Sequence, residues 1–437
     1  MMRRIGFVVT ALAFTGLGAA MAQGATSETY RQLNLFGDVF EKVRADYVDE
    51  VADSKMIEAA INGMLASLDP HSSYMNDKNF RDMQVQMRGE FGGLGLEVTM
   101  EGGVVKVITP IDDTPASRAG IKTNDLIVQI NGTQVMGLTL AEAVEKMRGP
   151  VDSKITVKIV RQGVAQPIDI SLQRAVIRLK SVRFRREGDV AYVRITSFNE
   201  QTQQGLDKAL ETLEDQITAE RLQGVVLDLR NNPGGLLDQA ISVSETFLDK
   251  GEIVSTRGRN PEDTVRYNAK TNSDKERGKP VIILVNGGSA SASEIVAGAL
   301  QDHRRAVVLG TRSFGKGSVQ TIIPIPGQGA LRLTTARYFT PSGRSIQAKG
   351  IEPDIEVLQA KPGTETAAAP GQATIRSEAD LPNHLKGDGE GDGAEDAPPV
   401  TRTAEEIPEN KDQDYQLAYA LDLLRGVSQA TAKAAAP

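Results

Sequence analysis

The sequence of 437 residues predicts an α/β protein with a smaller β-rich domain before its main core. Three observations lead to this prediction. Residues 89–172 hold short apolar runs separated by Gly, Asn and Asp turns. From about residue 176 to 357, buried-type strands alternate with amphipathic helices, which favours a mostly parallel sheet. Residues 359–410 are rich in Ala, Pro, Gly, Thr, Glu and Asp, which is typical of a disordered linker.

The first 22 residues have the form of a secretory signal peptide. Arg3 and Arg4 precede an apolar stretch, and Ala20-Met21-Ala22 is a small-x-small cleavage site. An uncleaved anchor is the alternative, because about 16 apolar residues fall just short of a membrane span. We therefore expect export to the periplasm, with membrane association if the segment stays attached.

Residues 23–84 are predicted to be mainly helical, because apolar side chains recur there at spacings of three and four. Two interpretations stay open for these apolar side chains: they pack on the rest of the protein, or they form a dimerisation arm. The apolar positions are Leu33, Phe36, Phe40, Val43, Tyr47, Ile57, Ile61, Met64 and Leu68.

Residues 85–174 are predicted to form the small β-rich domain. The expected strands are residues 94–99, 104–108, 125–130, 155–160 and 168–172, and the expected helices are 116–119 and 140–147. Together with the glycine-rich run at residues 92–96, the segments Pro115-Ala116-Ser117-Arg118-Ala119-Gly120, Asp125-Leu126-Ile127 and Ile130-Asn131-Gly132 resemble a PDZ domain.

PDZ domains bind the C-terminal carboxylate of a peptide with the backbone N–H groups of such a glycine-rich loop, and the peptide adds a strand to the sheet. The resemblance therefore assigns substrate binding to Gly93, Leu94, Gly95 and Leu96. The alternative is a loop that only turns the chain.

The main core is predicted over residues 175–358. Residues 224–229 and 281–285 are continuous apolar runs, as in strands that are buried on both faces. Glycine-rich turns follow both of them, at residues 231–235 and 286–288. Functional sites of α/β proteins gather at such carboxyl ends of strands.

Ser291 lies between the second turn and a helix expected over residues 294–300. A helix N-terminus stabilises negative charge, so a serine hydroxyl placed there can act as a nucleophile beside an oxyanion site. The backbone N–H groups of Ala292 and of Gly235 (or Gly234) are the candidate donors. The alternative is a helix cap, because Ser291-Ala292-Ser293-Glu294 also has the form of a capping box.

The three histidines are poorly placed to act as a base for this serine. His71 lies far upstream, and His384 lies in the expected linker. His303 falls near the end of the same helix, on the order of 15–18 Å from Ser291.

Lys316 is the better candidate base, since Phe314, Gly315 and Gly317 around it are apolar or small. A free lysine has a pKa of about 10.4, so work near neutral pH needs a depression worth about 4 kcal/mol. Gln320 can orient the amine without adding charge. The alternative is a surface lysine in a turn.

Three segments together resemble the carboxyl-terminal processing peptidases, or tail-specific proteases, and the likeness spans residues 28–357. These segments are residues 228–235, 285–299 and 310–320. The resemblance implies a crotonase-like protease core with Ser291 as nucleophile, Lys316 as general base and Gln320 as its orienting partner.

The resemblance also implies that the PDZ domain gates access and recognises substrate C-termini, with Arg148 coupling the bound peptide to the active site. Relatives need no metal or nucleotide cofactor. In some of them a C-terminal helix, here within residues 411–437, helps dimerisation. The expected partners are protein substrates bound by their tails, a second copy of the chain in a homodimer or larger oligomer, and an envelope adaptor protein.

The sequence thus predicts a serine endopeptidase of the cell envelope that cleaves proteins at or near their C-termini. The net charge of −7 argues against nucleic acid as a partner, and the absence of cysteine excludes a thiol nucleophile and disulfides. Two alternatives stay open: a non-catalytic PDZ scaffold, and an acyl-CoA enzyme of the crotonase superfamily, against which export argues.

Overall fold

The computed structural model describes most of the chain after the predicted signal peptide, which itself lies outside the described residues. The described ranges are residues 27–111, 113–271, 273–276, 278–359, 374–375, 377–387, 402–403, 407–408 and 413–434. The chain divides into two units, residues 1–60 and residues 61–437. Among the helices of the described residues, none is long and apolar enough to cross a membrane.

The first unit holds helix α1 (Ser27–Asp46) and the start of α2 (Asp53–Ala66). The apolar stripe of α1 is exposed within this unit, with 58% of Leu33 and 47% of Phe36 accessible to solvent. The rings of Phe36 and Phe40 stack on each other at 6.5 Å between centroids. The predicted helical region is therefore present, and the other described residues of its unit leave its stripe uncovered.

The second unit contains the small β-rich domain as a six-stranded antiparallel sheet with two helices. Its order is β3-β4-β5-β7-β8, with β6 paired to β5. Its elements are β3 (Leu96–Glu101), β4 (Val104–Pro110), α4 (Pro115–Arg118), β5 (Leu126–Ile130), β6 (Thr133–Gln134), α5 (Leu140–Met147), β7 (Lys154–Val160) and β8 (Ile168–Gln173). Asp125, placed in a strand by the sequence, instead precedes β5 and binds the side chain of Arg161.

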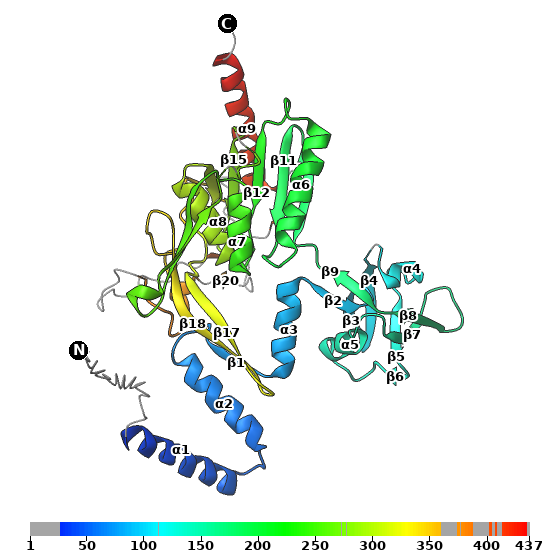
Figure 1. Cartoon of the computed structure of the whole chain (residues 1–437). Helices are drawn as coiled ribbons and strands as arrows, with labels where there is room; N and C mark the ends of the chain where they lie inside the picture. Colours follow the sequence, from blue (N-terminus) through cyan, green and yellow to red (C-terminus); the bar gives the residue numbers. More distant parts are fainter. Residues whose placement is uncertain are drawn as a thin grey trace, which may run out of the picture. The chain divides into compact units, whose positions relative to one another are not determined.

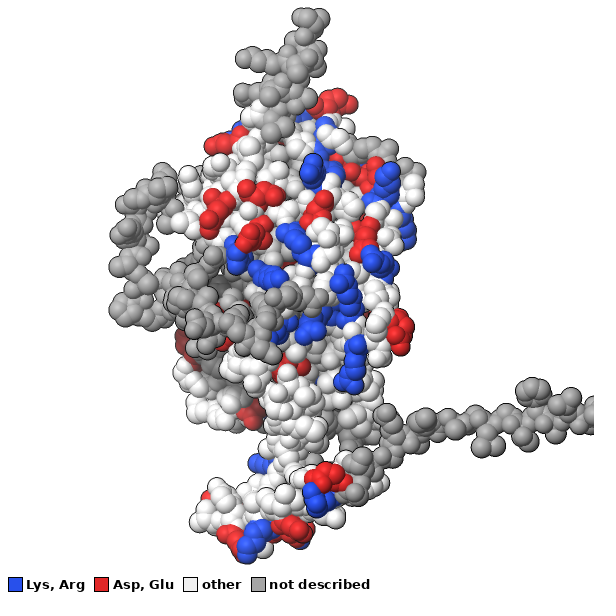
Figure 2. All heavy atoms as spheres, turned by 90° about the vertical axis from the view of Figure 1, so that its left-hand side faces the viewer, with Lys and Arg blue, Asp and Glu red and all other residues white. Residues whose placement is uncertain are grey.

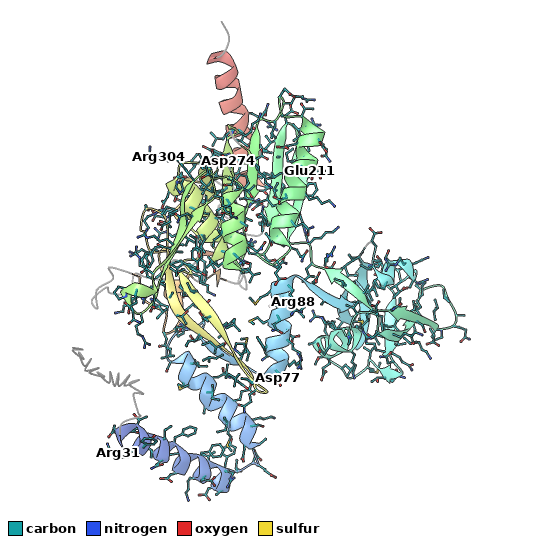
Figure 3. All side chains as sticks on the ribbon, viewed as in Figure 1. Arg31, Asp77, Arg88, Glu211, Asp274 and Arg304 are labelled. Carbon is teal, nitrogen blue, oxygen red and sulfur yellow. The ribbon has the colours of Figure 1, made fainter. Side chains whose placement is uncertain are left out.

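The chain enters and leaves this domain through one pair of antiparallel strands, β2 (Glu90–Gly93) and β9 (Ala175–Arg178). Helix α3 (Asp77–Arg88) precedes β2, and Figure 3 labels the residues at its two ends. Asn76 caps the helix at its start, and Gly89 ends it in the left-handed conformation with φ 68°. These caps fix where the helix gives way to the strand pair.

The main core is built on a second six-stranded sheet, with the order β10-β11-β12-β15-β16-β19. Figure 1 labels its neighbouring strands β11, β12 and β15. The first pair is antiparallel, and the four other pairs are parallel. The strands are β10 (Val182–Glu187), β11 (Val190–Ile195), β12 (Gly224–Asp228), β15 (Val281–Val285), β16 (Ala306–Gly310) and β19 (Ile355–Glu356). The predicted α/β class is confirmed, and the buried apolar runs form the two central strands.

Helices cover both faces of this sheet, which explains why β15 is apolar throughout and β12 is apolar up to its last residue, Asp228. One face packs on α6 (Thr202–Ile217), α7 (Leu237–Glu245) and α8 (Ala292–Asp302). The other face packs on α9 (Tyr415–Ala434) through Leu417, Ala420, Leu421 and Leu424. The terminal helix therefore docks on its own core, and it continues past Gly426, where the sequence suggested its end.

The second unit contains a further sheet, which the sequence predicted only in part. It has the order β1-β18-β13-β14, with β17 paired to β18. Its strands are β1 (Ser73–Met75), β13 (Gly251–Arg257), β14 (Val265–Ala269), β17 (Ser318–Ile325) and β18 (Gly329–Phe339), and a short 3₁₀ turn, η1 (Pro261–Asp263), precedes β14. Figure 2 shows acidic and basic side chains interspersed on one face of the molecule.

Part of the predicted disordered linker is ordered. Residues 377–387, which we call the tail segment, begin with the 3₁₀ turn η2 (Glu378–Asp380), and Glu378 is fully buried. Two short strands, β20 (Thr374–Ile375) and β21 (Arg402–Thr403), pair antiparallel within the same stretch. The sequence did not predict these elements, because composition alone cannot reveal their long-range contacts.

Candidate active site

Ser291 begins helix α8 at the carboxyl end of β15, with φ 56° and ψ −112°. Such positive φ values are uncommon outside glycine and need support from the surroundings. Hydrogen bonds to the neighbouring turn supply this support: the Ala290 N–H and the Ser293 hydroxyl both donate to the Asn232 carbonyl, at 3.0 and 2.9 Å. Residues 290–293, which we call the serine turn, are thus joined directly to the glycine turn at residues 231–235.

Gly234 lies against the serine turn so closely that a side chain does not fit. A Cβ atom added to it would stand 2.8 Å from Cβ of Ser291 and 2.9 Å from the backbone nitrogen of Ala292. The turn at residues 231–235 therefore reaches the immediate neighbourhood of the predicted nucleophile.

The hydrogen bonds distinguish the candidate oxyanion donors. The Gly234 N–H donates to Oδ1 of Asn232 at 2.9 Å. Within the described part of the chain, the N–H groups of Gly235 and Ala292 have no acceptor. Ala292 is in the first turn of α8, where a helix leaves its N–H groups free. This pattern favours Gly235 over Gly234 as the partner of Ala292.

Glu294 connects the serine turn to the loop of residues 313–317, which we call the base loop. Its carboxylate accepts hydrogen bonds from the N–H groups of Ser291 (2.7 Å), Gly315 (2.7 Å) and Lys316 (2.9 Å), and from the Ser313 hydroxyl (2.6 Å). The backbones of the predicted nucleophile and base therefore share one carboxylate. Burial raises the pKa of Glu294 to about 7, against the effect of these donors.

The sequence placed Glu294 only in a capping box, and the structure retains that contact to the Ser291 N–H. Its second role, holding the base loop, was missed. The available indication was a charged residue in a helix whose other side chains are small or apolar.

Lys316 is half-buried on the base loop, between β16 and β17. Burial lowers the pKa of its amine from 10.5, and the positive charge of Arg332 lowers it further. The carboxylates of Glu378, Glu294 and Asp69 act in the opposite direction. The net effect lowers the pKa of Lys316, which is the direction that a general base requires.

Gln320 lies on β17, four residues after Lys316. Its amide nitrogen donates to the Ser318 hydroxyl at 2.9 Å and to the Thr334 hydroxyl at 3.2 Å. Thr334 in turn donates to Asp69 at 3.0 Å. The amide is thus oriented with its nitrogen engaged, and no hydrogen bond among the described residues joins Gln320 to Lys316.

Each histidine has a partner away from Ser291. His71 Nε2 lies 2.8 Å from a carboxylate oxygen of Glu378. His303 Nε2 lies 2.7 Å from the Glu252 carbonyl, and His384 Nδ1 lies 3.1 Å from the Leu381 carbonyl.

The glycine-rich loop of the β-rich domain is tied to its own domain through its carbonyl groups. Leu94 is buried, and its carbonyl accepts from the Ala116 N–H at 2.9 Å. The Gly95 carbonyl accepts from the Ile111 N–H at 2.9 Å, and Gly95 has φ 77°. Gly93 ends β2, and Leu96 begins β3, so the structure brings all four predicted binding residues into one turn.

Arg148, the predicted coupling residue, is the C-cap of α5. Its contacts are with residues other than Lys316. Its guanidinium lies 4.6 Å from the centre of the Phe91 ring, and one nitrogen lies 3.8 Å from a carboxylate oxygen of Asp82 on α3. Its Nε is buried, and no hydrogen-bond partner for it is present among the described residues. Arg148 therefore joins the β-rich domain to α3.

The fold and the site define a class: a hydrolase-type α/β core preceded by a PDZ-like domain. Comparison with known proteins agrees. Residues 189–357 match Peptidase family S41, residues 107–161 match the PDZ domain, and residues 16–79 match the N-terminal domain of the activating protease CtpB.

Curated relatives extend this match over the whole chain. A carboxy-terminal-processing protease of Bartonella bacilliformis is 52% identical over 98% of this chain and 96% of its own length. The carboxy-terminal processing protease CtpA of Bacillus subtilis is 34% identical over 79% of this chain and 73% of its own. Among solved structures, a photosystem II D1 C-terminal processing protease is 30% identical, with a TM-score of 0.43 over 76% of this chain and 94% of that chain.

The chain belongs to the carboxy-terminal processing proteases, PDZ-containing serine peptidases of family S41.

Proposed function

We propose that this serine peptidase cleaves protein chains through Ser291, with Lys316 as the general base. The neutral amine of Lys316 takes the proton of the Ser291 hydroxyl as the oxygen attacks the scissile carbonyl. The protonated amine then gives this proton to the leaving amine. A water molecule, deprotonated by Lys316, hydrolyses the acyl-enzyme and restores the serine.

The observation that carries this proposal is the shared carboxylate of Glu294, which accepts hydrogen bonds from the backbones of both Ser291 and Lys316. The N–H groups of Ala292 and Gly235 would hold the oxyanion of the tetrahedral intermediate. Gln320, its nitrogen engaged by Ser318 and Thr334, would offer its amide oxygen to the protonated Lys316.

We further propose that the PDZ domain binds the C-terminal tail of the substrate. The N–H groups of residues 93–96 would bind the terminal carboxylate, and the peptide would extend the sheet beside β3. Arg148, which already contacts Phe91 and Asp82, would couple this binding to the core.

The signal-peptide pattern of the first 22 residues supports localisation to the cell envelope, with the periplasm as the compartment. The proposed organisation is then signal peptide 1–22, helical region 23–84, PDZ domain 85–174, protease core 175–358, linker 359–410 and terminal helix region 411–437. We also propose that the chain associates with further copies of itself and binds an envelope adaptor protein.

Cleavage of a reporter protein with an apolar C-terminal tail tests the mechanism. Ser291→Ala and Lys316→Ala should each abolish cleavage, whereas Lys208→Ala, an exposed lysine on α6, should retain it. Cleavage that persists in the Ser291→Ala protein would refute the assignment. A wild-type protein that binds the tail and cleaves nothing would favour the PDZ scaffold instead.

A further inference from the structure

The tail segment inserts a buried carboxylate next to the base loop. Glu378 is fully buried, and its backbone N–H donates to the carbonyl of Phe314 at 3.0 Å. Phe314 is two residues before Lys316. A segment that follows the protease core in sequence is therefore bonded to the loop that carries the proposed base.

The carboxylate of Glu378 has partners from two other parts of the chain. His71 Nε2 lies 2.8 and 2.9 Å from its two oxygens, and the Gln347 amide donates to it at 3.1 Å. Gln347 is also fully buried, and its oxygen accepts from the Gly317 N–H at 3.0 Å. The base loop is thus held on both sides of Lys316, at Phe314 directly and at Gly317 through Gln347.

Further contacts keep the tail segment in this position. The Gln347 amide also donates to the Leu385 carbonyl at 3.0 Å, and Asn383 donates to the Ala66 carbonyl at 3.1 Å. His71 is anchored in turn, because its carbonyl accepts from Arg332 at 2.9 Å and its N–H donates to Asp69 at 2.8 Å.

We propose that Glu378 is a positioning residue for Lys316, so that the tail segment completes the catalytic site from beyond the protease core. Glu378 would hold the base loop through Phe314, His71 and Gln347. This inference rests on the proposed role of Lys316 as the general base. The inference gives the tail segment, whose composition resembles a linker, a role in positioning the general base.

The charges around the Lys316 amine make the proposal measurable. Arg332 on β18 is the cation that faces it, while Asp69 before β1, Glu294 on α8 and Glu378 in the tail segment are the anions. His71 lies against Glu378. Removal of the Glu378 charge should favour the neutral amine and move the acidic limb of the kcat/KM profile to lower pH.

The experiment compares Glu378→Ala and Glu378→Gln with a matched control, Glu276→Gln. Glu276 is also a buried glutamate, but it lies before β15, at the opposite end of the strands from Ser291. Glu378→Ala should lower kcat by roughly 10- to 100-fold with little change in KM, because small displacements of a catalytic group have such effects. Glu378→Gln should retain more activity and show the shifted acidic limb, and the control should show neither effect.

A second readout separates this inference from the proposed function. The pH dependence of Lys316 modification by an amine-reactive ester, followed by peptide mass spectrometry, requires no cleavage activity. In the Glu378→Gln protein this profile should move to lower pH. An unchanged profile, with wild-type kcat in both Glu378 variants, would overturn the positioning role. Cleavage by the Ser291→Ala protein would instead overturn the proposed function. The pH profile of Lys316 labelling would then be the test of whether Glu378 acts on Lys316.

Discussion

Glu294 is the residue on which the arrangement of the site depends most. It is fully buried, and it accepts four hydrogen bonds from the serine turn and the base loop. An amide at this position could accept only through its oxygen and would direct its NH₂ group at N–H donors. Glu294→Gln should therefore reduce kcat by about 100-fold or more. Steady-state kinetics with the tail reporter would measure this loss, and near-normal kcat would contradict it.

The same residue predicts a dependence of stability on pH. Because the pKa of Glu294 is raised from 4.5 to about 7, the folded protein binds this proton more tightly than the unfolded chain. Its contribution to stability is full below pH 4.5 and is lost as the pH rises through about 7, up to about 3 kcal/mol. Urea unfolding of Glu294→Gln should show a flatter pH profile than wild type over this window.

Glu276 is a matched control for that experiment, since burial raises its pKa to about 7 as well. Glu276→Gln should flatten the stability profile similarly and leave cleavage intact. An equal loss of activity in both variants would indicate general damage rather than a role at the site.

Gly234 gives a second prediction at the residue scale. Its φ of 95° and its contact with Ser291 and Ala292 leave no room for a side chain. Gly234→Ala should lower kcat on the order of 100-fold by displacing the serine turn. Gly137 has nearly the same φ, 93°, and no atom of the described residues lies within 4 Å of an added Cβ. Gly137→Ala therefore introduces the backbone strain without a steric clash. Equal kcat in the two variants, measured with the tail reporter, would contradict the proposed close packing.

At the scale of elements, α9 is tied to β12, the strand that leads into the glycine turn at residues 231–235. Arg230 follows β12, is fully buried, and bonds Asp228 and Asp414 at 2.7 and 2.8 Å. Asp414→Ala should reduce the free energy of unfolding by about 3 kcal/mol, because the buried guanidinium of Arg230 loses one of its two carboxylate partners.

Asp422 on the same helix is the control for this change. It is 76% exposed and pairs with Arg425 one turn away, so Asp422→Ala should change stability by less than about 1 kcal/mol. Urea unfolding measures both values. Similar values for the two variants would show that the buried pair does not anchor the helix.

The sequence predicted those elements whose pattern is local. The apolar runs at β12 and β15 and the glycine turns after them indicated Ser291 as the candidate nucleophile. The apolar and small neighbours of Lys316 indicated the candidate base. It could not predict how His71 meets Glu378, since these residues are 307 positions apart and the tail segment is polar. The sheet built on β18 was equally hidden, because its partners β1 and β13 are distant in sequence.

At the scale of the whole molecule, the exposed stripe of α1 predicts self-association. Leu33, Phe36 and Val43 remain exposed within their unit, and a second copy of the chain would cover them. Phe36→Asp should therefore convert an oligomer into monomers in sedimentation analysis. Lys42→Glu, on the same helix and 77% exposed, should leave the oligomer intact. A wild-type protein that sediments as a monomer would contradict this prediction.

The central claim is that Ser291 forms the covalent intermediate and that Lys316 activates it. Peptide mass spectrometry after an acid quench, with an activated ester that makes deacylation slow, tests this most directly. We predict an acyl group on Ser291 in the wild-type protein and none in the Lys316→Ala protein. Turnover with acylation at another residue, or full acylation of Ser291 without Lys316, would contradict the account.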